Sequence, residues 1–139
     1  MSSGYFVHAV AARFGAGASL LWDRAYGEVG TTIHDVSITP AGGGSILLAG
    51  HGTGGLDFGG GQLLGGDHLG GFVAWLDSAG AHVWSRGLGG EGDIQGVSAA
   101  VTPDGDVLFA GSFAGDIDFP EGAMMSQGKR DFFLLKLVP

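Results

Sequence analysis

The sequence contains no cysteine and no asparagine, and only six of its 139 residues are lysine or arginine. Without cysteine there are no disulfides, no thiolate catalysis and no cysteine-ligated zinc. Without asparagine there is no acceptor for N-glycosylation. Fourteen acidic residues leave a net charge of −8. Nucleic-acid binding needs a basic surface, and an anionic membrane surface would repel this chain, so both partner classes are excluded.

Long apolar runs are also missing. No stretch of about 18 apolar residues occurs, so we expect no transmembrane helix. The first residues, MSSGYFVHAVAARFGAG, lack a basic segment before their apolar stretch, which His8 and Arg13 interrupt. We therefore expect no signal peptide. The cellular compartment stays open.

Glycine is the abundant residue, with 30 positions, while 45% of the chain is hydrophobic. Such a chain can form a core, and its length suits one domain. The glycines stand between short apolar runs, as expected of turns and strand ends. The composition therefore favours many short elements joined by tight turns.

The chain repeats itself with an offset of 61 to 63 residues. Asp57-Phe58 recurs as Asp118-Phe119, Trp22 recurs as Trp84, and Thr39-Pro40 recurs as Thr102-Pro103. The stretch GGFVAWLDS (70–78) likewise matches RDFFLLKLV (130–138), and GYFVHAV (4–10) is a weaker third copy. We infer one module of two offset repeats, approximately residues 1–76 and 77–139.

Each repeat contains short apolar runs separated by turn residues, and no stretch has a helical apolar period with caps. Four strands are typical of such a unit, joined by turns such as TPAGGG, DSAG and TPDG. The sequence therefore predicts an all-β fold. The expected strands are Ile33–Thr39, Ser45–Gly50, Gly71–Asp77 and His82–Leu88 in the first complete unit, and Gln95–Thr102, Asp106–Ser112 and Phe132–Val138 in the second.

Four short antiparallel strands per unit are typical of a β-propeller blade. The stretches GVSAAVTPDGDVLFAGSF, DFFLLKL and FVAWLDSAGAHVWSRGLGG resemble the bacterial β-propeller repeat family known as SBBP, the seven-bladed β-propeller repeat. The resemblance covers nearly the whole chain and implies a bacterial protein in an extracellular or cell-surface setting. The period of about 61 residues is longer than usual for that family, and AARFGAGA (11–18) replaces the tight turn between the third and fourth strands.

Two blades cannot close a ring, because propellers have four to eight. The last unit lacks its fourth strand, while the chain begins with an unpartnered strand of that type, Ser19–Gly27. We expect this strand to complete the last blade of a neighbouring copy, in a homo-oligomer with three copies favoured over four. A fragment or engineered piece of a larger propeller is the alternative.

Carboxylates are the first candidates for a ligand site. Asp116 and Asp118 would share a strand face, and with Asp104 and Asp106 they offer hard oxygen ligands for Ca²⁺. No D-x-D-x-D-G loop accompanies them, and TPDGD is a sufficient turn without metal. We therefore favour turn and strand-end roles and expect no cofactor.

Two further motif classes argue against catalysis or nucleotide binding. GHGTGG (50–55) and GLGGEG (87–92) match G-x-G-x-x-G, but neither opens a helix, which phosphate binding requires. The five histidines form no metal or nucleophile motif, and the counterparts of His34 and His51 are Gln95 and Ser112. We interpret the histidines as polar residues on strand surfaces.

Tryptophan is the remaining candidate. Trp22 and Trp84 occupy the same repeat position, and Trp75 does not. Exposed indoles stack on sugars, whereas an indole repeated in register more often packs between blades. We favour packing and keep a ligand platform of Trp22, Trp84 and Trp75 as the alternative.

The sequence therefore predicts a non-enzymatic β-propeller module that binds or scaffolds a glycan or protein ligand. A multivalent lectin is the alternative. A hydrolase or lyase at the mouth of a central channel would need convergent histidine and carboxylate groups, which the sequence does not show. The segments 59–70 and 120–129, where the repeats diverge most, are the expected recognition loops.

Overall fold

The computed structural model describes residues 9–27, 30–64 and 67–139. Within these ranges all regular elements are β-strands, and there is no helix long and apolar enough to cross a membrane. The strands pair antiparallel in several small sheets. The predicted all-β fold class is confirmed.

The largest sheet, called the central sheet here, has four strands. It runs in the order β3 (Thr32–Gly42), β4 (Ser45–Thr53), β7 (Gly70–Leu76) and β8 (His82–Leu88). These strands coincide with the four predicted in the first unit. Leu47 and Ala49 belong to one hydrophobic core and Leu48, between them, to another. A strand buried on both faces explains the continuous apolar runs in the sequence.

The second sheet has three strands in the order β9 (Asp93–Val101), β10 (Val107–Ala114) and β13 (Asp131–Leu137). All three were predicted. Residues of β10 alternate between buried and half-buried positions. Along β13, which is an edge strand, Phe133 and Leu137 are buried, whereas Phe132 and Leu134 are exposed. Among the described residues, no strand pairs with the outer edge of β13.

The N-terminal hairpin pairs β1 (Ala9–Phe14) with β2 (Leu20–Tyr26). Two expectations are corrected here. The strand expected at Ser19–Gly27 without a partner is paired within its own chain. In addition, Ala11–Phe14 belongs to β1 rather than to a turn. Residues 4–8 of the expected copy at 4–10, including His8, lie outside the described residues.

Three hairpins close with the same five-residue turn. In Gly15–Ser19, Asp77–Ala81 and Thr102–Asp106, the first residue donates its N–H to the fifth carbonyl and the fourth residue donates to the first. The fourth residue has positive φ in every case: 59° at Ala18, 79° at Gly80 and 88° at Gly105. The turn between β1 and β2 is therefore as tight as its two counterparts, contrary to the expectation for AARFGAGA.

The long connections in the two sheets each form a small hairpin. β5 (Leu56–Asp57) pairs with β6 (Gln62–Leu64), and β11 (Asp116–Phe119) pairs with β12 (Gly122–Met125). The sequence predicts loops at residues 59–70 and 120–129. Parts of both are instead strand, because short pairs such as Ile117 with Met124 bring apolar residues together across the turn.

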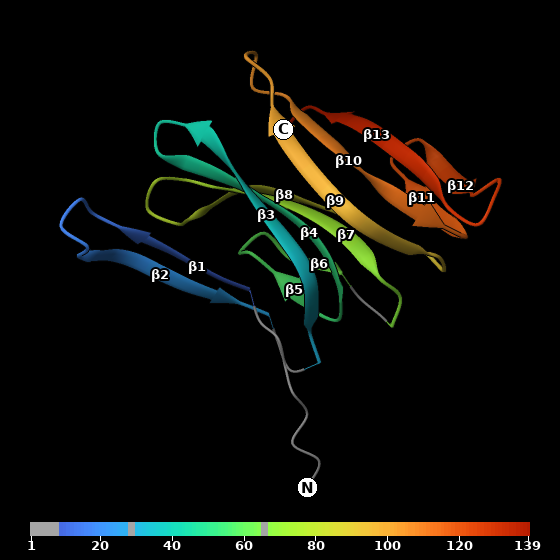
Figure 1. Ribbon diagram of the computed structural model, residues 1–139, viewed down its shortest axis with the longest axis horizontal. Coiled ribbons are helices and arrows are strands. Elements are labelled where there is room, and N and C mark those ends of the chain that lie inside the picture. Colours follow the sequence, from blue (N-terminus) through green and yellow to red (C-terminus); the bar gives the residue numbers. More distant parts are fainter. Residues whose placement is uncertain (1–8, 28–29, 65–66) are drawn as a thin grey trace, which may run out of the picture.

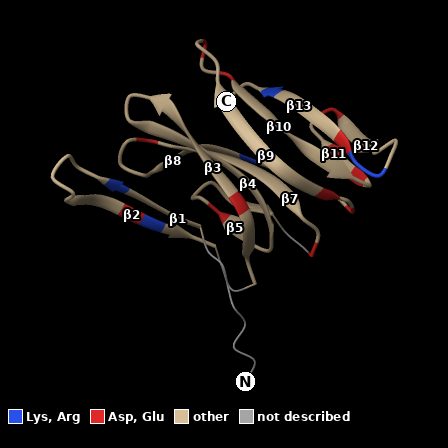
Figure 2. Cartoon of the chain, in the orientation of Figure 1, with Lys and Arg blue, Asp and Glu red and all other residues tan. Residues whose placement is uncertain are grey.

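The hairpin, the central sheet and the second sheet stack as three layers (Figure 1). β9 runs against β3, β4 and β7, and Thr39 Oγ1 donates 3.0 Å to the carbonyl of Ala99 across the layers. Most residues carry no charge, and the few charged residues are spread among strands and turns (Figure 2).

One hydrophobic core lies on each face of the central sheet. The core toward the hairpin includes Ala9, Ala11, Tyr26, Leu48, Leu56, Phe58, Phe72 and Leu76; the core toward the second sheet includes Leu47, Val73, Ile94, Val107, Phe109, Phe113, Phe133 and Leu137.

Candidate functional site

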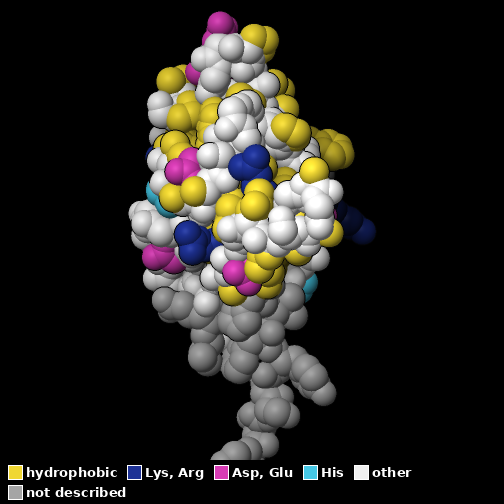
Figure 3. Space-filling model, turned by 90° about the vertical axis from the view of Figure 1, so that its left-hand side faces the viewer, with side chains coloured by type: hydrophobic (Ala, Val, Ile, Leu, Met, Phe, Trp, Pro, Cys, Tyr) yellow, Lys and Arg dark blue, Asp and Glu magenta, His cyan; other side chains and the backbone are white. Residues whose placement is uncertain are grey.

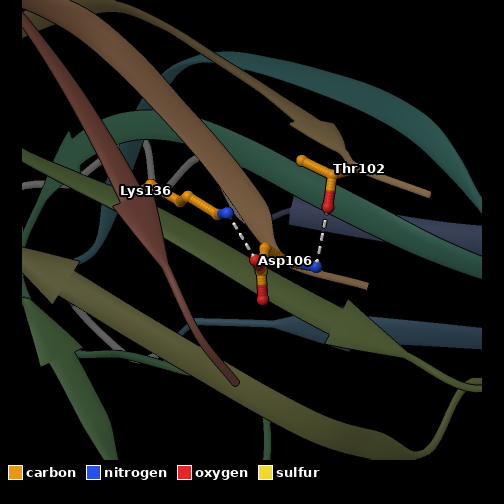
Figure 4. Close-up of polar contacts among 3 residues, drawn as sticks. All are labelled: Thr102, Asp106 and Lys136. Atoms are coloured by element: carbon orange, nitrogen blue, oxygen red, sulfur yellow. Dashed lines mark hydrogen bonds and ion pairs between the residues drawn. The ribbon is translucent and has the colours of Figure 1, made fainter. Parts of the chain in front are cut away.

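The first pair of candidate aspartates lies at the turn between β9 and β10. Asp104 is exposed at its tip. Asp106 Oδ2 is 2.8 Å from Lys136 Nζ, and the Asp106 N–H donates 3.1 Å to Thr102 Oγ1 (Figure 4). The carboxylate of Asp106 is thus paired with a cation of the same sheet. This arrangement makes the residue a link between the turn and β13.

The second pair lies at the opposite end of β10. Asp116 and Asp118 share the exposed face of β11, as the sequence predicted, and the backbone of this strand holds the segment at Gly89–Gly92. The carbonyl of Asp116 accepts 2.8 Å from the Gly92 N–H, and the Asp118 N–H donates 2.8 Å to the Gly89 carbonyl. The fold therefore separates the four aspartates into two pairs. Across the described ranges, no three His, Cys, Asp or Glu side chains gather as a metal site would require.

The repeated Asp-Phe residues have unlike roles in the two units. Asp57 Oδ1 accepts N–H bonds from Gly59 at 2.6 Å and Gly61 at 3.1 Å. Asp77 does the same in its own turn, accepting from Ala79 and Ala81. In both places a carboxylate orders a turn by binding backbone N–H groups. Asp118, the counterpart of Asp57, instead contributes through its backbone.

Trp22 joins the N-terminal hairpin to the central sheet. Its Nε1 donates 2.8 Å to the carbonyl of Ser78, which also accepts 2.8 Å from Arg13 Nη1. A side chain at Gly80 would collide with the indole ring, so this turn passes directly over it. The Tyr26 hydroxyl donates 3.4 Å to the Gly80 carbonyl, and burial raises the pKa of this tyrosine.

Trp75 and Trp84 lie opposite each other on β7 and β8. Both are partly buried and pack against the core between the central and second sheets. Trp22 packs in the equivalent way against the other core. All three indoles therefore pack against the hydrophobic cores between layers. Their use as a sugar platform stays a prediction.

The four histidines within the described residues do not converge on one place. His68 is exposed, and His82 Nε2 lies 2.8 Å from Ser85 Oγ. His34 and His51 stack with ring centroids 5.8 Å apart. His51 is only 9% exposed, and its Nδ1 has no hydrogen-bond partner. Burial lowers the pKa of His51, His34 and Arg130 lower it further, and Asp35 opposes them.

A groove with a volume of about 810 Å³ lies along the edge of β13 that has no strand partner among the described residues. Most of its lining residues belong to β13 and to the segment 119–127, which includes parts of the β11–β12 hairpin. We call it the β13 groove. Sequence reasoning missed it, although DFFLLKL already has apolar residues on both faces of an edge strand. Its lining includes Phe119, Met124, Met125, Phe132, Leu134 and Lys136.

No protein-family model, no curated protein and no solved structure matches this chain.

Proposed function

We propose that the chain is a non-enzymatic binding or scaffold module built from β-propeller blades, which assembles with other copies into a ring. The central sheet is the complete four-stranded blade, and the second sheet is a blade with three of its strands. The resemblance of the sequence to the SBBP repeat supports this proposal. So does the internal repeat, because β3–β4–β7 and β9–β10–β13 have the same order and direction.

The observation that carries the proposal is the burial of the central sheet on both faces. Leu47 and Val73 of this sheet pack toward the second sheet, while Leu48 and Phe72 pack toward the hairpin. The two end layers are each covered on one face only. The hairpin and the second sheet therefore each have one uncovered apolar face. In the central sheet the corresponding face is covered by the next layer.

The outer face of the hairpin displays Val10 and Phe14, which are 72% and 61% exposed. Figure 3 shows apolar side chains reaching the surface on this side of the molecule, with several charged side chains among them. The outer face of the second sheet displays Phe132 and Leu134. Contact between these unlike faces is heterologous and leads to a closed ring when the rotation per copy fits. The central and second sheets are the two blades of each copy, so three copies, which we favour over four, supply six blades, with a hairpin at each contact between copies.

The separation of the aspartates, the dispersed histidines and the packed indoles support a binding role rather than a catalytic one. A binding module needs only a surface, and a ring presents the same surface several times. The two small hairpins, where the repeats diverge most in sequence, supply that surface in the proposal.

Substitution on the hairpin tests the assembly. Val10→Glu places a charge on the outer face, where the side chain is exposed within one chain but covered in the ring. We expect sedimentation velocity to show a smaller particle for this variant than for the unchanged protein. Val83→Glu, at an exposed position of β8 away from both end faces, is the matched control. Equal particle sizes for the unchanged protein and Val10→Glu would refute this interface.

A further inference from the structure

The β13 groove runs beside a strand whose sequence suits the interior of a sheet. Apolar side chains occupy five of the seven positions of β13, on both of its faces. Phe132 is 90% exposed and Leu134 is 70% exposed. Natural edge strands are usually protected by charges, proline or a bulge, because their free N–H and C=O groups recruit other strands. Within its central part, β13 has none of these protections.

The central sheet shows what fills the equivalent place. β7, the counterpart of β13, is followed by β8, which pairs along it from Gly71 with Leu88 to Leu76 with His82. The hairpin β5–β6 lies beside these two strands, and β6 contacts both β7 and β8. The hairpin β11–β12 is the counterpart of β5–β6 in the repeat, and together with β13 it lines the groove. The β13 groove therefore corresponds to the slot that β8 fills in the central sheet.

β8 is more polar than β13, as expected of the outermost strand of a sheet. Its sequence HVWSRGL has polar side chains at His82, Ser85 and Arg86, and most of its residues are half-buried or exposed. β2, which closes the N-terminal hairpin, has a related sequence, LLWDRAY. The two strands share a tryptophan, an arginine two residues later and an apolar residue two residues after that. This shared pattern describes a fourth strand in this fold.

We propose that the β13 groove binds an extended peptide segment by strand addition, and that the segment has the pattern Trp-x-Arg-Gly-apolar found in β8. The proposal rests on the repeat within one chain and does not require the ring. Strand addition satisfies the free backbone groups of β13, and pockets along the groove read alternate side chains of the segment.

The register follows from the repeat. Val73 pairs with Arg86 and Trp75 pairs with Trp84 in the central sheet. Sixty-one residues later, β13 has Leu134 and Lys136 at the corresponding positions. The arginine of the segment then lies across from Leu134, where its aliphatic stem covers an exposed apolar side chain. The tryptophan lies across from Lys136, where a cation above an indole is favourable.

Glycine is required at one position of the segment. In β8 a side chain at Gly87 would collide with the backbone of Leu63 in β6. The β11–β12 hairpin contributes to the lining of the β13 groove, and in the proposal its backbone faces the same position of a bound segment. β2 carries Ala25 there and has no small hairpin beside it. The β8 sequence is therefore the better match to the groove.

The test uses a synthetic peptide with the sequence of Ala81–Gly89, titrated calorimetrically into the full chain. We expect one peptide to bind per chain. In an antiparallel pair alternate N–H groups point toward the neighbouring strand. One peptide is therefore N-methylated at the positions of residues 83, 85 and 87, and another at those of 82, 84, 86 and 88. Strand addition predicts that one of the two keeps binding and the other loses it.

Two substitutions locate the binding. Leu134→Glu changes an exposed position in the groove, and we expect it to weaken peptide binding by about tenfold or more, as loss of one buried leucine contact would. Ile38→Glu, at a comparably exposed position of β3, is the control and leaves binding unchanged. A peptide with alanine at the position of Gly87 should bind less tightly than its parent.

The outcomes separate this proposal from the ring. If the peptide binds and the protein has the mass of one chain, the groove proposal holds and the ring proposal fails. If an assembly loses mass as the peptide binds, the peptide and a neighbouring copy compete for the surface at Phe132 and Leu134, and both proposals hold. Failure of the parent peptide to bind the folded chain, whatever its mass, overturns the groove proposal. Equal binding by the two N-methylated peptides also overturns it.

Discussion

The indole Nε1 of Trp22 donates a 2.8 Å hydrogen bond to the carbonyl oxygen of Ser78, 56 residues away in sequence. This contact fastens the N-terminal hairpin to the turn between β7 and β8. It also places the indole against Gly80. Any side chain at position 80 would collide with the indole ring. One side chain thus sets the distance between two layers.

Shortening Trp22 should loosen the hairpin. Trp22→Phe removes the hydrogen bond but keeps an aromatic ring, and we expect a loss of about 1 kcal/mol in the free energy of unfolding. Trp22→Ala also removes packing and should cost about 2–4 kcal/mol, less than for a fully buried tryptophan. Urea unfolding of both variants measures these losses. Equal, negligible effects would show that Trp22 does not fasten the layers.

The tight turn at Gly15–Ser19 contains a residue in a left-handed conformation that glycine tolerates best. Ala18 has φ of 59°, where its two counterparts are Gly80 and Gly105. Ala18→Gly should therefore stabilise the protein by about 0.5–1 kcal/mol. Gly105→Ala should destabilise it by a similar amount, because the added methyl group meets open space and only the backbone is strained.

Gly17→Ala is the matched control for this turn. Gly17 has no positive φ and also faces open space, so the substitution carries neither backbone strain nor a collision. The change in stability caused by Gly17→Ala should be small compared with the change caused by Gly105→Ala. If thermal melting moved Ala18→Gly and Gly105→Ala in the same direction, the three turns would not be equivalent.

Protonation of His51 at acid pH should lower the free energy of unfolding. Its pKa is lowered in the folded protein, by burial first and then by the nearby His34. The unfolded chain therefore binds a proton at higher pH than the folded chain does. This contribution to stability is complete above the ordinary histidine pKa of about 6.5 and is lost as the pH falls below it.

A comparison of urea midpoints at about pH 7.5 and pH 5 measures this loss. His51→Ser introduces the residue that occupies the counterpart position, Ser112, and should reduce the acid sensitivity. His68→Gln, at an exposed position, should leave it unchanged. An undiminished loss in His51→Ser would assign the acid sensitivity to other groups.

The sheets could be predicted from sequence because their signals are local. Apolar runs such as ILLAG and VLFAG, followed by TPDG or DSAG turns, specify strands and hairpins without any long-range information. The repeat then indicated the strand order. Seven strands of the central and second sheets agree with the prediction to within a few residues at each end.

The errors arose where local signals were weak. The strands β5, β6, β11 and β12 are short and glycine-rich, so their pairing depends on the sheets beside them rather than on propensity. The strand at Ala11–Phe14 was missed because alanine, rather than glycine, stands at the left-handed position of the turn that follows it. The separation of Asp104 and Asp106 from Asp116 and Asp118 depends on a complete strand lying between them, which spacing in sequence does not reveal.

The mass of the folded chain in solution tests the central claim most directly. Light scattering on protein eluting from a sizing column measures it without reference to shape. A ring of three copies predicts three times the chain mass of 14.0 kDa, with no dependence on concentration above the assembly range. A mass of one chain at every concentration, with the strand content intact by circular dichroism, would contradict the proposed assembly.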